Sequence, residues 1–414
     1  MTDIVDEFAK SFDELLPAYD FLMGNSSNAT PPTGSTMEEA IQNILEGKDE
    51  KKPFPLALKP ELVERILIHL ESGKDVILVG APGVGKTALA RRILKYCSNL
   101  IGKTDYITSV AHADWTSRDL IGGLNLEGNK FSKGRMLEAI EAGKLLLIDE
   151  FNRADINKAF GEMFLAIESR EINLSEDKAE VYGKKVIEIP KEFQFIGTMN
   201  DFDKNLLLTE LSYGLITRLA FVDVEPDSNK EEEAVKAQIN DIQNYDKCSD
   251  QIGSYYEFVN KVRDERMIGV RTSKDIVSYL LSAYPYSQNG TKSWRNLDAA
   301  ICDYLEPQFD RLNTSLLEHA LKCSKSILKD NVPNFNYKLD KKIKEQKLMT
   351  GFMLNVSETV EKSVGNTDTG SKKPSKRSDD KSPTMVTAGK QSWITRRRNA
   401  AKKKATGRRR KRKS

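Results

Sequence analysis

Eight consecutive residues have the spacing GxxxxGK[ST] of a phosphate-binding loop. They are Gly80, Ala81, Pro82, Gly83, Val84, Gly85, Lys86 and Thr87. Glycines let the backbone curl so that its N–H groups surround an anion, and a helix continuing through Ala88 would add its amino end to that site. Lys86 would reach the β and γ phosphates of a nucleotide, and the Thr87 hydroxyl would ligate Mg²⁺. The alternative is a plain glycine turn between a strand and a helix.

A second group of polar residues follows two later apolar strands. Residues 145–148 are a run of Leu and Ile that ends in Asp149 and Glu150. Phosphoryl transfer needs charge stabilisation and a positioned nucleophile, so Asp149 would complete the Mg²⁺ shell and Glu150 would orient and deprotonate the attacking water. The strand at 193–199 ends at Asn200, whose neutral amide could hold the same water. Taken singly, these residues could instead form solvated turns.

The elements that must position these residues alternate between helices and strands. A helix is expected near 60–72, and another from Lys86. Short apolar strands are expected at 76–79, 106–110, 145–149 and 193–198. This alternation predicts an α/β fold in which helices cover a parallel sheet, because the carboxyl ends of the strands would then bring the polar residues together.

After Pro226 the strand signals end and helical patterns take over. These patterns cover 229–243, 254–266, 273–283, 295–310 and 314–329. We therefore expect an α/β core at 51–226, followed by a smaller helical domain with C-terminal helices at 227–363.

The two ends of the chain carry opposite charge. Residues 1–50 hold 11 acids against two lysines, and they are expected to form a short helix at 3–16 and then a polar linker. Residues 371–414 hold 18 Lys and Arg against two Asp, with few apolar residues. The tail at 364–414 is therefore expected to be disordered. Its dense basic run at 408–413 could contact a nucleic-acid backbone, and a solvated or sorting tail is the alternative.

Composition excludes several classes of protein. No run of about 18 apolar residues occurs, so no membrane-spanning helix is expected. The acidic residues that follow Met1 argue against a secretory signal, and a soluble, cytoplasmic protein is expected. The four cysteines show no CxxC spacing and the three histidines are dispersed, so we expect neither a disulfide framework nor a zinc site.

The motifs and their order resemble those of the AAA+ ATPases, and within them the MoxR-like and dynein-related group. The likeness covers about residues 56–285, and it rests on the motifs at 80–87, 145–155 and 195–200. It implies a P-loop NTPase sheet with an α-helical lid. It also implies a small hairpin at 124–134 and a β-hairpin at 170–190, which resemble two insertions of that group.

Two arginines acquire roles through this resemblance. Arg218 stands where the family places an arginine that reaches the γ-phosphate of a neighbouring subunit, although Thr217 and Leu219 differ from the more usual Asp-Arg-Phe. Arg271 resembles the lid arginine that senses nucleotide. The resemblance therefore implies a homo-oligomeric ring, of six subunits, with a site shared between neighbours.

The function implied by the resemblance is Mg²⁺-dependent ATP hydrolysis that remodels a protein client. ATP in place of GTP is implied by the family alone, because a phosphate loop does not read the base. One alternative is a motor similar to McrB-type members of the group, held on DNA or RNA by residues 371–414. Another is a nucleotide-dependent binding switch with little turnover. Turnover stimulated by nucleic acid would favour the motor, and tight binding without turnover would favour the switch.

Overall fold

The computed structural model describes residues 37–364, apart from 49, 104, 126, 201–218, 240–241, 243, 264–265, 287–289 and 311. The helix expected at 3–16, the linker after it, Arg218 and the basic tail lie outside the described residues. Among the described residues, those up to Phe352 form one compact unit, and those from Met353 belong to a second.

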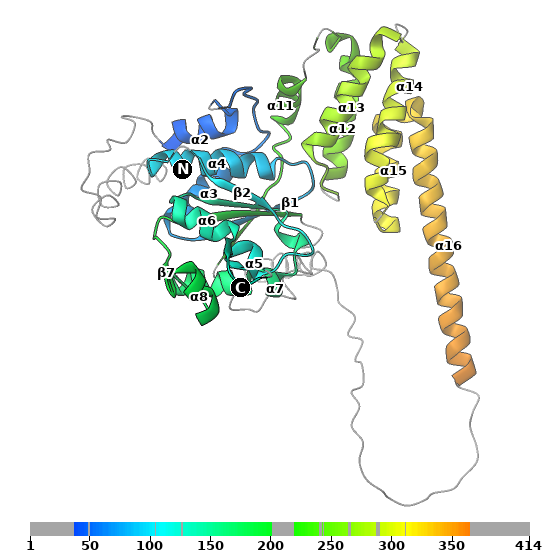
Figure 1. The fold of residues 1–414 in the computed structure, drawn as a ribbon. Coiled ribbons are helices and arrows are strands. Elements are labelled where there is room, and N and C mark those ends of the chain that lie inside the picture. Colours follow the sequence, from blue (N-terminus) through cyan, green and yellow to red (C-terminus); the bar gives the residue numbers. More distant parts are fainter. Residues whose placement is uncertain are drawn as a thin grey trace, which may run out of the picture. The chain divides into compact units, whose positions relative to one another are not determined.

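A parallel sheet forms the centre of the α/β part, with the strand order β2-β5-β8-β1-β9 (Figure 1). The strands are β1 (Asp75–Gly80), β2 (Ile107–Val110), β5 (Leu146–Asp149), β8 (Phe195–Asn200) and β9 (Leu219–Asp223). Strands covered on both faces have unbroken apolar sequences, and β1 is buried along its whole length. The predicted fold class, a P-loop NTPase sheet covered by helices, is confirmed.

The edge strand β9 has no counterpart among the strands expected from the sequence. Its residues Ala220 and Phe221 are half-buried and Asp223 is exposed, so β9 is less buried than β1. Parallel pairing with β1 holds these residues in a strand, and this pairing is not visible in the sequence of β9.

Alternate side chains of the sheet enter two separate cores. Ile77 and Val79 pack in one apolar cluster with α6 and α7, whereas Val76 and Leu78 pack in the other with α2, α3 and α4. The helices are α2 (Met37–Glu46), α3 (Pro60–Glu71), α4 (Lys86–Leu100), α5 (Ser117–Leu120), α6 (Arg135–Ala142) and α7 (Ile156–Ser169). The buried Arg92 of α4 binds the carbonyl oxygens of Ile44 and Leu45, so it fixes α2 against this core.

Both expected insertions are present. In the first, β3 (Gly122–Leu124) pairs antiparallel with β4 (Phe131–Lys133). In the second, β6 (Glu171–Asn173) pairs antiparallel with β7 (Val186–Glu188), but the loop between them contains an additional helix, α8 (Glu176–Tyr182). The sequence does carry start and stop signals for this helix: Ser175 precedes an acidic first turn, and Gly183 ends the helix in a left-handed conformation.

Among the described residues after β9 there are helices and connections but no further strand, as the sequence predicts, and one apolar cluster unites the helices. These are α11 (Glu231–Gln238), α12 (Ser249–Arg263), α13 (Val270–Ala283), α14 (Gly290–Ala300), α15 (Thr314–Ile327) and α16 (Pro333–Val364). The helix expected at 295–310 begins earlier and ends in a π turn and a 3-10 turn at Glu306–Phe309. Pro307 explains that change, because it cannot donate the next α-helical hydrogen bond.

None of the described helices is long and apolar enough to cross a membrane. All four cysteines are free thiols. Within the described ranges, no three His, Cys, Asp or Glu residues gather as metal ligands. The cytoplasmic location expected from the sequence stays a prediction.

Candidate nucleotide-binding site

The phosphate loop joins β1 to α4 and has the backbone that its glycines permit. Gly83 has a φ of 78° and Gly85 a φ of 104°, conformations that side-chain-bearing residues rarely adopt. Gly85 also caps the amino end of α4, which begins at Lys86. The predicted loop is therefore followed by a helix amino end, and the two together form an anion-binding geometry.

Lys86 lies inside the loop and not in solvent. Its ammonium donates to the carbonyl oxygens of Gly80 at 2.8 Å and Ala81 at 2.9 Å. It also donates to Oδ1 of Asn200 at 3.2 Å, and only 7% of the residue is exposed. A buried ammonium at this point can bind phosphate oxygens by a small movement of its flexible stem.

Thr87 and Asp149 lie next to each other at the carboxyl edge of the sheet. The Thr87 hydroxyl donates to Oδ1 of Asp149 at 2.9 Å. The buried Thr198 hydroxyl donates to the same oxygen and accepts a hydrogen bond from the Glu150 amide at 3.2 Å. Mg²⁺ prefers hard oxygen ligands and commonly takes one or two carboxylates together with substrate phosphates. The residues present therefore fit a Mg²⁺ ion held by Thr87 and Asp149.

Glu150 has a left-handed backbone with a φ of 57°, which is uncommon for a residue with a side chain. Such strained positions cluster at functional sites. Its Oε2 accepts hydrogen bonds from Nε of Arg153 at 3.2 Å and from Nδ2 of Asn200 at 3.3 Å. The two ends of the Asn200 amide therefore bind Lys86 and Glu150, and one side chain links the phosphate loop to the acidic residue.

Sheet register explains how residues far apart in the sequence meet here. Gly80, at the end of β1, pairs directly with Asn200, at the end of β8. On the other side of β8, Ile148 of β5 pairs with Gly197. Three neighbouring strands thus end at one edge, which is where ligands bind in parallel α/β sheets.

The structure describes only one of the two predicted arginines. Arg271 is the second residue of α13, and its backbone amide donates to the Gly83 carbonyl oxygen at 3.1 Å, so its backbone lies at the phosphate loop. The nucleotide-sensing role of its side chain stays a prediction. Arg218 lies outside the described residues, and its role stays a prediction.

Sequence reasoning missed two residues of this network, Thr198 and Arg153. Thr198 precedes Asn200 by two positions on a strand, so strand alternation alone places both on the same face. Arg153 follows Glu150 by three positions in a 3-10 turn, where side chains three apart are neighbours. Both spacings are visible in the sequence, but they identify Thr198 and Arg153 as site residues only once the strand and the turn are known.

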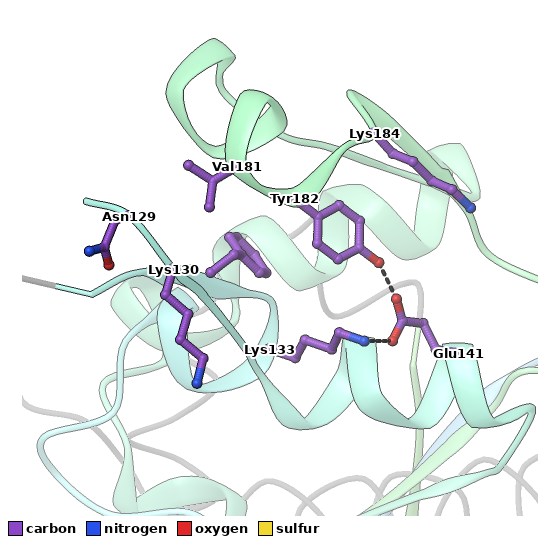
Figure 2. A pocket seen from close by; sticks show the side chains of 8 residues that line it. Asn129, Lys130, Lys133, Glu141, Val181, Tyr182 and Lys184 are labelled. Atoms are coloured by element: carbon purple, nitrogen blue, oxygen red, sulfur yellow. Dashed lines mark hydrogen bonds and ion pairs between the residues drawn. The ribbon is translucent and has the colours of Figure 1, made fainter. Parts of the chain in front are cut away.

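A separate cavity of about 450 Å³ lies between the two insertions and α6 (Figure 2). Figure 2 shows Glu141 of α6 accepting hydrogen bonds from Lys133 of the first insertion and Tyr182 of the second. Partial burial acts to raise the pKa of Glu141, but these two hydrogen bonds and the charges of Lys133 and Lys184 together lower that pKa. Glu141 thus joins the two insertions away from the phosphate loop.

Fold and site together define a P-loop nucleotide hydrolase with an α-helical C-terminal part. Residues 75–219 match the family model described as AAA domain (dynein-related subfamily). The predicted recognition of an AAA+ ATPase of the MoxR-like and dynein-related type is confirmed.

One curated relative is the type IV methyl-directed restriction enzyme EcoKMcrB subunit of Escherichia coli (strain K12), which is 27% identical over 236 residues. The match covers 53% of this chain and 48% of the relative, so the chain spans about half the length of the relative it matches. A solved structure of NtrX from Brucella abortus in complex with ATP has a TM-score of 0.37 and 14% identity, and covers 83% of this chain and 74% of that chain. A likeness this low carries no conclusion about the site.

Proposed function

We propose that this protein binds ATP with Mg²⁺ and hydrolyses it as a ring-forming AAA+ ATPase. The observation that carries the proposal is the continuous chain of contacts from Lys86 through Asn200 to Glu150. It places a cation, a neutral amide and a carboxylate around one edge of the sheet, beside an anion-binding loop.

Each residue then has a distinct task. Loop amides and Lys86 bind the phosphates, while Thr87 and Asp149 hold Mg²⁺, which neutralises developing charge on the phosphate oxygens. Glu150 accepts a proton from the attacking water, and Asn200 holds that water in line with the phosphorus. Glu150 must leave Arg153 to do so, because the two are paired at 3.2 Å in this structure.

Replacing Lys86 by alanine tests the proposal most directly. The phosphate loop would lose the cation that it holds against Gly80 and Ala81, so nucleotide affinity should fall by roughly 10²-fold. Titration with fluorescent ATP and GTP analogues measures that loss, and it also compares the two bases. Lys95→Ala is the matched control, because Lys95 is an exposed lysine of the same helix. Full affinity in a folded Lys86→Ala protein would overturn the assignment.

A second candidate function is that hydrolysis drives a motor associated with nucleic acid, and two observations favour it. A methyl-directed restriction enzyme subunit is a relative over more than half of this chain. Residues 371–414 also carry 18 cations against two acids, enough to contact a phosphate backbone independently of its sequence. Remodelling of a protein client by a MoxR-like ring of six subunits is the other candidate.

Removing residues 371–414 separates these two candidates. If the tail holds nucleic acid, truncation should weaken binding to DNA or RNA at least tenfold, and the binding that remains should depend less steeply on salt. Basal nucleotide hydrolysis should stay nearly unchanged, because every motif of the site precedes Thr272.

A variant with alanine at positions 408–413 should give intermediate affinity, since it removes six of the 18 cations. Undiminished binding by the truncated protein would exclude the tail's role. Strong turnover in the full chain that nucleic acid does not alter would favour a protein client. Tight nucleotide binding without turnover would favour the switch.

A further inference from the structure

The backbone of the turn that opens α13 lies directly against the phosphate loop. A Cβ atom added to Gly269 would lie 2.1 Å from the carbonyl oxygen of Pro82. A Cβ atom added to Gly83 would lie 2.8 Å from Cβ of Arg271. Real Cβ atoms do not approach other atoms so closely, so both glycines are required by contact. We call residues 269–271, which contact Pro82 and Gly83, the loop clamp.

The loop clamp fixes the direction of an amide in the phosphate-binding loop. The Arg271 amide donates to the Gly83 carbonyl oxygen at 3.1 Å. In a planar trans peptide, the C=O group and the N–H group of the next residue point in opposite directions. Because the Gly83 oxygen faces the start of α13, the Val84 N–H points away from α13. The clamp therefore sets the orientation of one of the donors on which anion binding depends.

A buried ion pair holds the clamp from behind. The guanidinium of Arg263 donates to the carbonyl oxygen of Ile268 at 3.1 Å and pairs with Glu231 at 2.6 Å. Arg263 is 8% exposed and Glu231 is fully buried. The Ser273 hydroxyl donates to Glu231 at 2.6 Å, and the Tyr255 hydroxyl donates to that of Ser273 at 3.1 Å. The network joins α11, α12 and α13 immediately beside the clamp.

Stability alone is a weak explanation for this pair. Removing two charges from water costs free energy that their attraction often only offsets, and apolar replacements of such pairs are often neutral or stabilising. An ion pair in this place does supply a fixed geometry for the Ile268 carbonyl group, which an apolar contact would not.

We propose that Arg263 and Glu231 are positioning residues of the nucleotide site, which hold the turn at Ile268 so that Gly269 fits against Pro82 and the phosphate loop keeps its binding conformation. Neither residue touches the nucleotide. The inference rests on the proposed nucleotide binding and adds to it two residues that act through the backbone of the loop.

Gly269→Ala tests the clamp in the full-length protein. The added methyl group cannot fit against Pro82, so the turn must move, and the dissociation constant for a fluorescent ATP analogue should rise about tenfold. Hydrogen exchange at residues 80–87 should also become faster in the absence of nucleotide. Gly253→Ala is the matched control, because Gly253 of α12 has nothing within 4 Å of an added Cβ atom. It should leave both measurements unchanged.

Arg263→Lys tests the ion pair with less risk to folding, since it keeps a cation beside Glu231 but loses the planar arm that binds Ile268. It should raise KM for nucleotide about tenfold and change kcat less. Asp298→Asn is its control: Asp298 is 1% exposed and caps the start of α16, so this change should lower the unfolding midpoint without altering KM.

Three outcomes would contradict a part of this proposal. If Gly269→Ala binds nucleotide as tightly as a wild-type protein that binds normally, the positioning role is wrong, but the proposed nucleotide binding still holds. Equal effects of Arg263→Lys and Asp298→Asn on KM would also overturn the positioning role, because they would reveal general loosening of the helical part. Wild-type protein that binds no nucleotide would overturn the proposed function itself.

Discussion

Glu150→Gln should bind nucleotide as tightly as the wild-type protein but hydrolyse it about 10³-fold more slowly. Glutamine keeps the size of the side chain and can still accept hydrogen bonds from Arg153 and Asn200. It cannot accept a proton, and general-base catalysis contributes roughly 10² to 10⁴ in rate. Binding is measured with a fluorescent analogue, and turnover is measured by phosphate release at saturating nucleotide.

Glu162→Gln is the matched control, because Glu162 is an exposed carboxylate of α7, the helix that follows the acidic pair. Arg153→Ala adds a second comparison: it frees Glu150 from its ion pair, so turnover should be retained, in contrast to the large loss of rate expected for Glu150→Gln. Loss of nucleotide binding together with turnover in a folded Glu150→Gln protein would show that Glu150 supports the structure and is not the base.

The parts of the site that could be predicted are those encoded in short contiguous stretches. The phosphate loop, the apolar strand before Asp149 and the strand before Asn200 each carry their own pattern. Parallel pairing then forces the strand ends to one edge, so knowing the sheet type is enough to bring them together. The pairing of Gly80 with Asn200 is the outcome that this logic requires.

The parts that could not be predicted depend on contacts between distant segments. Nothing around Gly269 in the sequence shows that Pro82 lies against it, and nothing around Arg263 shows that Glu231 is its partner. The same holds for β9, whose half-exposed pattern becomes a strand through pairing with β1. Local propensity is a weak guide at such positions, because tertiary packing decides them.

Arg218 lies outside the described residues, and its role as an arginine supplied to a neighbouring subunit comes from the resemblance to the AAA+ family. If it has that role, Arg218→Ala should reduce turnover by about 10³-fold or more while each chain still binds nucleotide, because such arginines contribute 10³ to 10⁵ in rate. A residue that acts on a neighbour can be complemented. When Arg218→Ala chains, which keep Lys86, are mixed with Lys86→Ala chains, which keep Arg218, part of the activity should return at interfaces where an intact loop meets an intact arginine. Turnover is measured over a series of mixing ratios, in assemblies whose co-assembly is shown by differently tagged chains. Recovery should peak near equal amounts, where mixed interfaces are most frequent. Co-assembled rings with no recovery at any ratio would contradict the role of Arg218 in a neighbour's site.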